Sequence, residues 1–473
     1  MAALRSKLHF LAVLTFAAVS IGAQTKSEVD RDELQRRITE LESQIKAIGA
    51  EIAELRKSSQ AAAIPGKEVA AGPARDTAPT SPTPRRENPP AAGDVKITPY
   101  GTIYFNAFGN TGGVNNTDVP MWATAGTSSS SSSVRQTRLG LKVDGIKAGN
   151  ARVAAVVEAD FFGGVPGVGI GENFGVVRLR LANARLNWEK SSLTIGQDWM
   201  VFAPQNPVSL AAAAIPQLAA AGNNWARLPQ VKVEHRFNPN IVLQAAVLAP
   251  QTGDSSPSPA FLIQPNSGAA SNFPFLQSRI VFSGKNWLGS GKPGTVGISG
   301  HFGRSRIFQG TPSIGRTIDS TGIAADWNFP LAKRVSISGE VFFGQNLGGF
   351  QAGVFQGYNP DPLVLNGSNL EPQGARAIST RGGWVQAGFT PNVLKDRLTV
   401  YASFGIDDPS DEDLLSVVPR DWRTQNTAFA FDAIYRVTPQ FSVGAEVRSF
   451  RTTYFLSGTR RATHFNLAAA YSF

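Results

Sequence analysis

The last ten residues of the chain alternate strictly between apolar and polar positions. Phe465, Leu467, Ala469, Tyr471 and Phe473 fall on one face, and the residues between them are small or polar. A period of two predicts a β-strand. The apolar face ends in two aromatic residues, which is typical of a strand whose outer side meets lipid. We therefore expect this strand to close a barrel, although many soluble β proteins also end in an edge strand.

The same alternation recurs from residue 94 onward. Very short turns and long polar loops separate the alternating segments in strict succession, which places both ends of the sheet on the side of the short turns. The long loops are expected at 110–133, 163–173, 201–224, 250–272, 304–316, 347–377, 407–421 and, shorter, 456–460. Sixteen strands are expected, at approximately 95–109, 134–145, 151–162, 174–188, 192–200, 225–237, 241–249, 273–286, 294–303, 317–329, 334–346, 378–390, 397–406, 422–437, 441–455 and 461–473.

The two faces of these strands differ in polarity. One face carries residues such as Leu139, Leu141 and Phe404, and the other carries residues such as Asp144 and Ser403. An apolar outside and a polar inside reverse the pattern of a soluble barrel. A soluble β-sandwich would also alternate, but its turns would not separate by length. The predicted fold class is all-β: a sixteen-stranded antiparallel transmembrane β-barrel, preceded by a short α-helical coiled coil.

Three segments precede the predicted barrel domain, 94–473. Residues 1–23 have a cationic start, an apolar run and a small final residue, which is typical of a cleaved signal peptide. Residues 24–57 carry a heptad seam that predicts a coiled-coil oligomerisation helix without fixing the number of chains. An amphipathic helix packed on its own domain is the alternative. Residues 58–93 are rich in Pro and Ala, which predicts an extended linker.

Composition narrows the class further. The chain has 473 residues, no Cys and a net charge of +10. Beyond the signal segment, no run reaches the ~18 apolar residues that a membrane helix needs. Tryptophans near the strand ends are expected to form interfacial girdles, with a core position as the alternative for each of them singly. These are Trp188, Trp199, Trp225, Trp287, Trp327 and Trp422.

Enzymatic chemistry finds no support in the sequence. The histidines, His9, His235, His301 and His464, lie on separate segments without catalytic or metal-binding spacing. The absence of Cys excludes thiolate metal sites. No nucleotide-binding fingerprint is present. We therefore expect no enzyme activity, no metal site, no cofactor and no nucleic-acid partner.

Four short stretches carry a family resemblance. They are Arg-Gln-Thr-Arg-Leu-Gly-Leu at 135–141, Glu-Ala-Asp-Phe-Phe-Gly at 158–163, Arg-Leu-Arg-Leu-Ala-Asn-Ala-Arg-Leu at 178–186 and Ile-Gly-Gln-Asp-Trp at 195–199. In this order, and within a plan of signal, heptads, linker and barrel, they resemble the DcaP-like porins. The resemblance implies a homotrimer of sixteen-stranded barrels, each narrowed by its third external loop. It also implies a basic constriction that favours anionic solutes such as dicarboxylates.

Two of the predicted long loops have unusual compositions. The third, 201–224, is strongly apolar and poorly suited to full exposure, so we expect it to fold inward. Burial at a subunit contact is the alternative. The loop at 407–421 is expected to be a solvated outer loop, with divalent-cation bridging to lipopolysaccharide as the alternative. Its acidic residues are Asp407, Asp408, Asp411, Glu412 and Asp413.

Charged residues on the inward faces are the candidate functional residues. Arg178 and Arg180 share one face, and two carboxylates on the preceding strand point into the same lumen. Arg185 joins them only if its strand slips phase, so a bulge is expected near Ala182. The arginines either create a field that holds carboxylate solutes or neutralise the two carboxylates. The expected pore-lining residues are Arg138, Lys142, Glu158, Asp160, Arg178, Arg180, Arg185 and Arg279.

The pattern and the resemblance together predict an outer-membrane porin. It would lie in the outer membrane of a two-membrane bacterium, with a periplasmic N-terminal arm, and allow passive diffusion of small hydrophilic, preferably anionic solutes. Outer-membrane lipid and lipopolysaccharide are its expected partners. A structural anchor whose coiled coil contacts the cell wall is the alternative. An outer-membrane hydrolase is a third hypothesis and would need a catalytic set on one rim of the barrel.

Overall fold

The computed structural model describes residues 95–164, 175–252, 265–285, 287, 291–309, 314–366, 369–372, 374–392, 394–417 and 419–473. The predicted signal peptide, coiled-coil helix and linker lie outside the described residues, so they stay predictions. In the described part of the chain, no helix is both long enough and apolar enough to cross a membrane.

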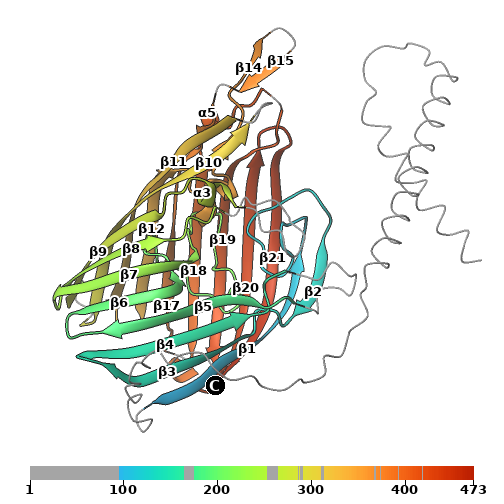
Figure 1. Ribbon diagram of the computed structural model, residues 1–473. Coiled ribbons are helices and arrows are strands. Elements are labelled where there is room, and N and C mark those ends of the chain that lie inside the picture. Colours follow the sequence, from blue (N-terminus) through green and yellow to red (C-terminus); the bar gives the residue numbers. More distant parts are fainter. Residues whose placement is uncertain are drawn as a thin grey trace, which may run out of the picture. The chain divides into compact units, whose positions relative to one another are not determined.

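Sixteen long strands form a closed antiparallel barrel (Figure 1). The first of them, β1, pairs with the last, β21, from Thr102 opposite Ser472 to Asn110 opposite His464. This pairing closes the ring and confirms the predicted number and direction of the strands. The strands are β1 (Lys96–Asn110), β3 (Arg138–Ala148), β4 (Ala151–Asp160), β5 (Arg178–Asn187), β6 (Ser191–Trp199), β7 (Arg227–Asn238), β8 (Ile241–Leu248), β9 (Phe275–Lys285), β10 (Pro293–Gln309), β11 (Ile314–Ala332), β12 (Val335–Gln345), β17 (Ser379–Phe389), β18 (Leu398–Pro409), β19 (Arg423–Arg436), β20 (Phe441–Tyr454) and β21 (Gly458–Ser472).

Shorter elements lie in the connections. A strand within the first long loop, β2, pairs with the C-terminal end of β1, from Asn106 to Asn110. Two small hairpins lie between β12 and β17. The short elements are β2 (Ser129–Ser133), α3 (Ser267–Ala270), η2 (Gly348–Phe350), α4 (Ala352–Phe355), β13 (Tyr358–Asn359), β14 (Leu363–Asn366), β15 (Asn369–Pro372), β16 (Arg376–Ala377), η3 (Leu394–Asp396) and α5 (Asp411–Leu414).

The loop expected at 304–316 is wrong for most of its length. β10 continues to Gln309 and β11 begins at Ile314, and the two strands pair as far as Gln309 opposite Ile314. Residues 304–309 of β10 alternate between the two faces, but their outer face carries Arg304 and Arg306, whereas the outer face earlier in the same strand carries apolar residues such as Ile298. The outer face of this stretch therefore does not look like a lipid-facing strand, although its backbone continues the ladder.

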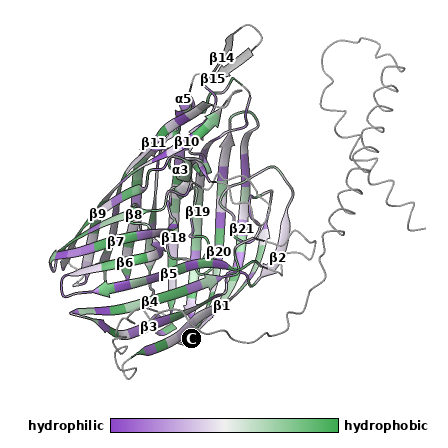
Figure 2. Cartoon of the chain, in the orientation of Figure 1, coloured by the Kyte–Doolittle hydropathy of each residue, from purple (hydrophilic) through white to green (hydrophobic). Residues whose placement is uncertain are grey.

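The polarity of the wall follows the predicted alternation, and Figure 2 shows green and purple positions alternating along the strands. On the outer face, Leu139, Leu141 and Phe404 are about half exposed, at 47%, 49% and 46%. On the inner face, Asp432 and Ser403 are each 1% exposed. The predicted inversion, with apolar side chains outside and polar side chains inside, is confirmed for these strands.

The seam between β1 and β21 is tightly fitted. The N–H of Phe473 donates to the carbonyl oxygen of Gly101 at 3.1 Å, and the N–H of Gly101 donates back at 3.2 Å. A Cβ on Gly101 would lie 2.8 Å from the ring of Phe473, which itself stacks on Tyr471 with ring centroids 6.4 Å apart. The absence of a side chain at Gly101 therefore makes room for the final aromatic ring.

Candidate functional site

The connection between β6 and β7, residues 200–226, lies inside the barrel; we call it the inner loop. Its hydrogen-bond partners come from strands around the circumference, which is possible only from within. The N–H groups of Val201 and Phe202 donate to Gln277 of β9, that of Gln205 to Glu340 of β12, that of Val208 to Gln386 of β17, and those of Ala213 and Ala214 to Gln136 just before β3. The predicted inward fold of this loop is confirmed.

Apolar packing explains the composition of the inner loop. Ile215 and Ala219 pack with Val119 and Met121 of the first long loop and with Val354 of α4. A second cluster joins the start of the inner loop to the residues between β12 and β17. Three loops thus share a hydrophobic core within the barrel, which stabilises them by removing apolar surface from water.

The inner loop approaches the wall at β17 and β18 with no space for side chains. A Cβ on Gly405 of β18 would lie 2.1 Å from the carbonyl oxygen of Ala221. A Cβ on Gly222 would lie 2.0 Å from the carbonyl oxygen of Gly383, and Gly222 has a φ of 96°. Glycine permits both the conformation and the close contact of the two backbones.

Carboxylates on one side of the wall are covered by the inner loop. Glu446 of β20 accepts hydrogen bonds from the hydroxyl of Ser209 at 2.6 Å and from Nε2 of Gln217 at 2.8 Å. The same amide reaches Asp432 of β19 at 2.9 Å. Glu340 on β12 accepts the N–H of Gln205. Each of these carboxylates is buried, so little of their charge faces open lumen.

Arg279 belongs to this covered wall. Its guanidinium makes two hydrogen bonds to Asp326 of β11, at 2.6 and 2.9 Å, and the two residues are buried. Nε2 of Gln205 also donates to Asp326, at 3.3 Å. The structure therefore places Arg279 apart from the other predicted pore-lining cations, in a pair beneath the inner loop.

Arg178 and Arg180 pair with the two carboxylates of the preceding strand. Arg178 binds Asp160 at 2.6 Å, and Arg180 binds both Glu158 at 2.6 Å and Asp160 at 2.7 Å. Arg178 also donates to the carbonyl oxygen of Ala214 at 2.8 Å. The side chain of Arg180 is only 3% exposed. These contacts are those of a charge ladder that also holds the inner loop; a role of the two arginines in selectivity stays a prediction.

The bulge expected in this strand is present. Glu158 of β4 lies opposite Leu181 and Ala159 lies opposite Leu179, so Arg180 is the extra residue on β5. The bulge was expected near Ala182 and lies two residues before it, at Arg180. It changes the phase of the strand, and Arg185 consequently reaches Ser192 at 2.8 Å and Glu234 at 3.2 Å on the inner face.

Cations remain partly exposed on the inner face of β3, β4 and β5. Lys142 lies 4.6 Å above the ring of Tyr100, and the guanidinium of Arg138 lies 5.9 Å from the ring centroid of Tyr104. Arg152 is exposed, and the side chain of Arg185 is 41% exposed. Among the described residues, no carboxylate lies within ion-pair distance of Arg138, Lys142 or Arg152. Arg152 was missed as a site residue, although its alternation with Glu158 placed it on the same face.

A further arginine, Arg227, contacts the inner loop where β7 begins. Its guanidinium lies 4.6 Å from the ring of Trp199 and 5.1 Å from that of Trp225, and it donates to the carbonyl oxygen of Ala214 at 3.2 Å. Trp225 donates from Nε1 to Gln351, which follows η2. The predicted girdle position is wrong for Trp225, because its partners are loop residues of the interior.

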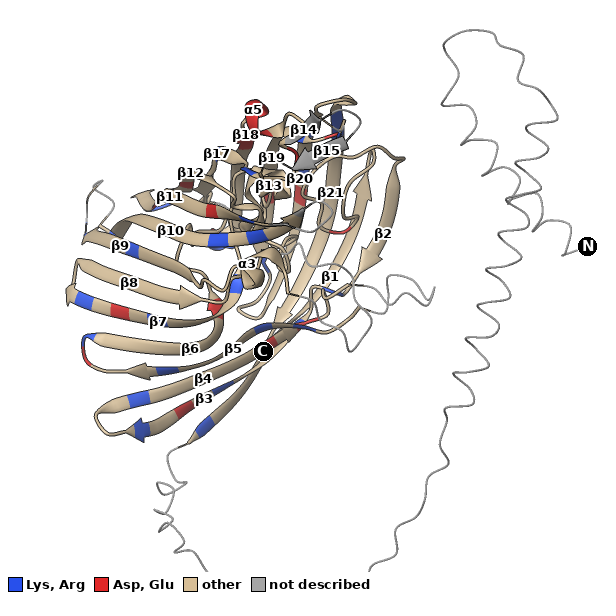
Figure 3. Ribbon diagram, turned by 45° about the horizontal axis from the view of Figure 1, so that its top comes forward, with Lys and Arg blue, Asp and Glu red and all other residues tan. Residues whose placement is uncertain are grey.

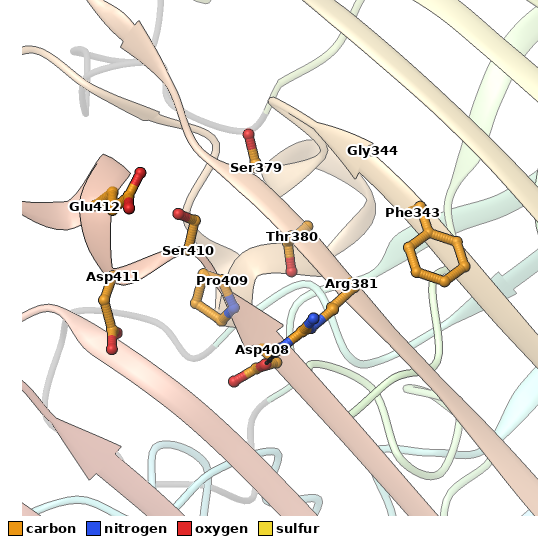
Figure 4. A pocket seen from close by; sticks show the side chains of 10 residues that line it. All are labelled: Phe343, Gly344, Ser379, Thr380, Arg381, Asp408, Pro409, Ser410, Asp411 and Glu412. Carbon is orange, nitrogen blue, oxygen red and sulfur yellow. Dashed lines mark hydrogen bonds and ion pairs between the residues drawn. The ribbon is translucent and has the colours of Figure 1, made fainter.

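The acidic loop is divided between two environments. Asp407 is buried and accepts the N–H groups of Gly353 and Val354, so a solvated position is wrong for this residue. Asp408 faces outward and pairs with Arg381 at 3.1 Å (Figure 4). No group of three or more His, Asp or Glu side chains able to hold a metal ion occurs in the described part of the chain.

Comparison with known proteins supports the fold. No protein-family model matches the chain, and no curated protein matches its sequence. The structure is similar to the outer membrane channel DcaP of Acinetobacter baumannii, at 17% identity over 81% of this chain and 99% of that chain, with a TM-score of 0.59. It is also similar to an anion-selective porin from Comamonas acidovorans, at 10% identity over 80% of this chain and 100% of that chain, with a TM-score of 0.50.

The barrel therefore has the porin fold: a closed sixteen-stranded antiparallel ring with an inner loop. Within that fold, the resemblance to DcaP-like porins is supported by the similarity of the two barrels.

Proposed function

We propose that the chain is an outer-membrane porin through which small hydrophilic, preferably anionic solutes diffuse passively. The apolar outer wall supports placement in a membrane, because strands that face lipid carry apolar residues outward. The similarity to two porins supports a channel. The family resemblance further supports a homotrimer in the outer membrane, with the N-terminal arm in the periplasm.

The observation that carries the anion preference is the unequal exposure of charge across the lumen. The inner loop covers the carboxylates of β11, β12, β19 and β20. The cations Arg138, Lys142, Arg152 and Arg185 on β3, β4 and β5 are not covered in this way. Asp144 is also exposed on this wall and Arg185 pairs with Glu234, so the wall carries an excess of positive charge and not positive charge alone. Because an excess of one sign along one wall of a channel raises the local concentration of counter-ions, anions are favoured over cations. Dicarboxylates are candidate solutes, since two carboxylates could contact two of these cations at once.

Reversal potentials of single channels in a salt gradient test this proposal. Replacing Lys142 and Arg152 by serine removes two exposed charges, and we expect the preference to move towards cations. Salt at physiological concentration screens exposed charges over a Debye length of ~8 Å, so a solute that passes within this distance of the two side chains should sense their loss. The matched change Arg178→Ser with Arg180→Ser asks whether the paired arginines also contribute.

The controls separate selectivity from folding. Each variant should first show the heat-resistant assembly of the parent protein on a gel. A folded Lys142→Ser, Arg152→Ser double variant with an unchanged reversal potential would contradict the proposed role of these cations. A parent protein that forms no channel in a planar bilayer would contradict the porin function itself.

A further inference from the structure

The hairpin of β10 and β11 carries an outward row of arginine and phenylalanine, which we call the basic–aromatic row: Phe302, Arg304, Arg306 and Phe308. These residues alternate with residues that face inward and are buried, including Ser305 at 0% and Ile307 at 7% exposure. Phe308 is 61% exposed. The inner side of the hairpin is thus packed, while its outer side is open.

The row begins where the neighbouring strands end. The pairing of β10 with β9 ends at Phe302 opposite Leu276, and that of β11 with β12 ends at Thr321 opposite Gln345. Phe302 and Thr321 face each other across the hairpin, so both neighbours stop at one level. Below this level the same outer face carries Ile298, which is 47% exposed. The outer face thus changes from aliphatic to basic and aromatic residues at the rim, as at a membrane–water interface.

Aromatic contacts connect the row to a hollow in the outer wall. The guanidinium of Arg304 lies 5.0 Å from the ring of Phe273 and 5.7 Å from that of Phe302, and the two rings meet edge to face at 5.5 Å. Phe273 also lines a cavity of about 680 Å³ with Val231 and Val247, whose side chains face outward from β7 and β8. Phe273 therefore connects the apolar hollow with the basic–aromatic row, because it lines the hollow and contacts both Arg304 and Phe302.

We propose that this surface binds a phosphate-bearing lipid of the outer leaflet, with the phosphate on Arg304 and Arg306 and an acyl chain in the hollow. Arginine offers planar paired donors that match phosphate oxygens. Arg304 pairs with Asp319 at 3.1 Å, where both side chains are exposed, and within the described residues Arg306 has no carboxylate at ion-pair distance. An exposed pair contributes little and can exchange its carboxylate for a phosphate.

The distribution of charge on the rim favours this sector. Figure 3 shows basic residues on β10, whereas α5 is acidic. Asp411, Glu412 and Asp413 of α5 would repel a phosphate from the rim near β17 and β18. The inference rests on the proposed membrane placement, but it does not depend on conduction.

Native mass spectrometry of the detergent-purified protein tests the proposal. The probe is lipid A with two phosphates, compared with the same lipid after removal of both phosphates. For Arg304→Gln with Arg306→Gln we expect about tenfold fewer adducts with the phosphorylated probe, the equivalent of about 1.4 kcal/mol. Adducts with the dephosphorylated probe should be few and should not differ between the parent and the variant.

A matched control uses two other exposed arginines near the rim. Arg381→Gln with Arg461→Gln removes the same charge from β17 and β21 and should leave adducts unchanged. Equal loss in both double variants would overturn the proposal in favour of a general charge effect, and full retention in the β10 variant would also overturn it. The single change Arg306→Gln, which breaks no ion pair in the described structure, covers the case in which the double variant fails to fold.

Conductance of the same preparations keeps the two proposals distinguishable. If the β10 variant conducts like the parent but loses lipid, the lipid site is supported independently of the pore. If the parent binds lipid but does not conduct, the proposed function fails while the lipid site stands.

Discussion

Buried charges in the wall are paired residue by residue. Arg180 reaches Glu158 and Asp160 from the bulge on β5, and Arg279 reaches Asp326 across one intervening strand. Pairing of this kind compensates for the loss of water around the ions, but it gives little net stability. Removal of one partner is different, because it leaves an uncompensated buried charge.

We therefore expect Arg180→Gln to lower the free energy of unfolding by about 3–5 kcal/mol. The change leaves Glu158 without its guanidinium partner at a site that is almost fully buried. Urea unfolding of the reconstituted barrel, followed by tryptophan fluorescence, measures the difference. Lys142→Gln is the control, because Lys142 is exposed and has no ion pair among the described residues; equal losses in the two variants would refute the argument.

A second prediction concerns Gly405. In Gly405→Ala, the new Cβ would lie 2.1 Å from the carbonyl oxygen of Ala221. This distance is too short for two unbonded atoms, so the inner loop must move away while the barrel wall stays in place. We expect changed single-channel conductance with normal assembly. Gly300→Ala on β10 is the matched control, since its nearest atom would be 3.9 Å away. Identical conductance in all three proteins would show that the inner loop is not seated on Gly405.

The sequence predicted the residues of the site unevenly. Glu158 and Arg180 lie on adjacent strands with alternating faces, so their meeting could be foreseen. Ser209 and Glu446 lie 237 positions apart. Their contact depends on where an irregular loop crosses the lumen, and no local pattern encodes that path. The covered carboxylates, which give the lumen its asymmetry, were therefore missed.

Among the elements, the strands were predictable because a period of two persists wherever one face is apolar. β2 was missed because its five residues are all serine and offer no alternation. The extension of β10 and β11 beyond their neighbours was missed because arginines interrupt the apolar outer row there, and Phe308 alone does not restore it. In both cases the strands continue to pair through their backbones where the sequence no longer alternates between apolar and polar side chains.

The inner loop is the element whose position should govern conduction. Ser209→Ala with Gln217→Ala removes three hydrogen bonds to Glu446 and Asp432. We expect larger and noisier single-channel currents, since the loop loses these anchors to β19 and β20 while its apolar contacts remain. Unchanged current and noise in a folded protein would show that the apolar packing alone fixes the loop.

At the scale of the whole molecule, the pairing of β1 with β21 closes the ring, so in the described residues free sheet edges remain only where strands extend beyond their neighbours, as in the hairpin of β10 and β11, and in the short elements of the loops. Such closure satisfies the backbone groups that an open edge would expose. The seam is also sealed by side chains, with Phe473 against Gly101 and Tyr471.

Phe473→Ala should reduce the amount of folded, heat-resistant protein in membrane fractions far more than it changes the conductance of the folded protein. Loss of the ring removes apolar contact at the seam, and large-to-small aromatic changes cost about 3–5 kcal/mol where the ring is fully buried; this ring is half exposed, so the cost is lower. Quantitative blotting of membrane fractions measures the effect. Phe389→Ala, an exposed aromatic at the end of β17, is the control.

The pairing of β1 with β21 should also affect the rate of folding. The hydroxyls of Thr102 and Ser472 meet at 3.0 Å although 370 positions separate them along the chain. Hairpins between successive strands can form locally, but this contact must bring together two distant parts of the polypeptide, and long-range pairing of this kind is slow. The entropy of closing such a ring grows only slowly with its length, by about 0.6 kcal/mol per doubling. The delay should therefore arise from the search for register between two distant edges, and the union of β1 with β21 should be the last and slowest event as the protein folds.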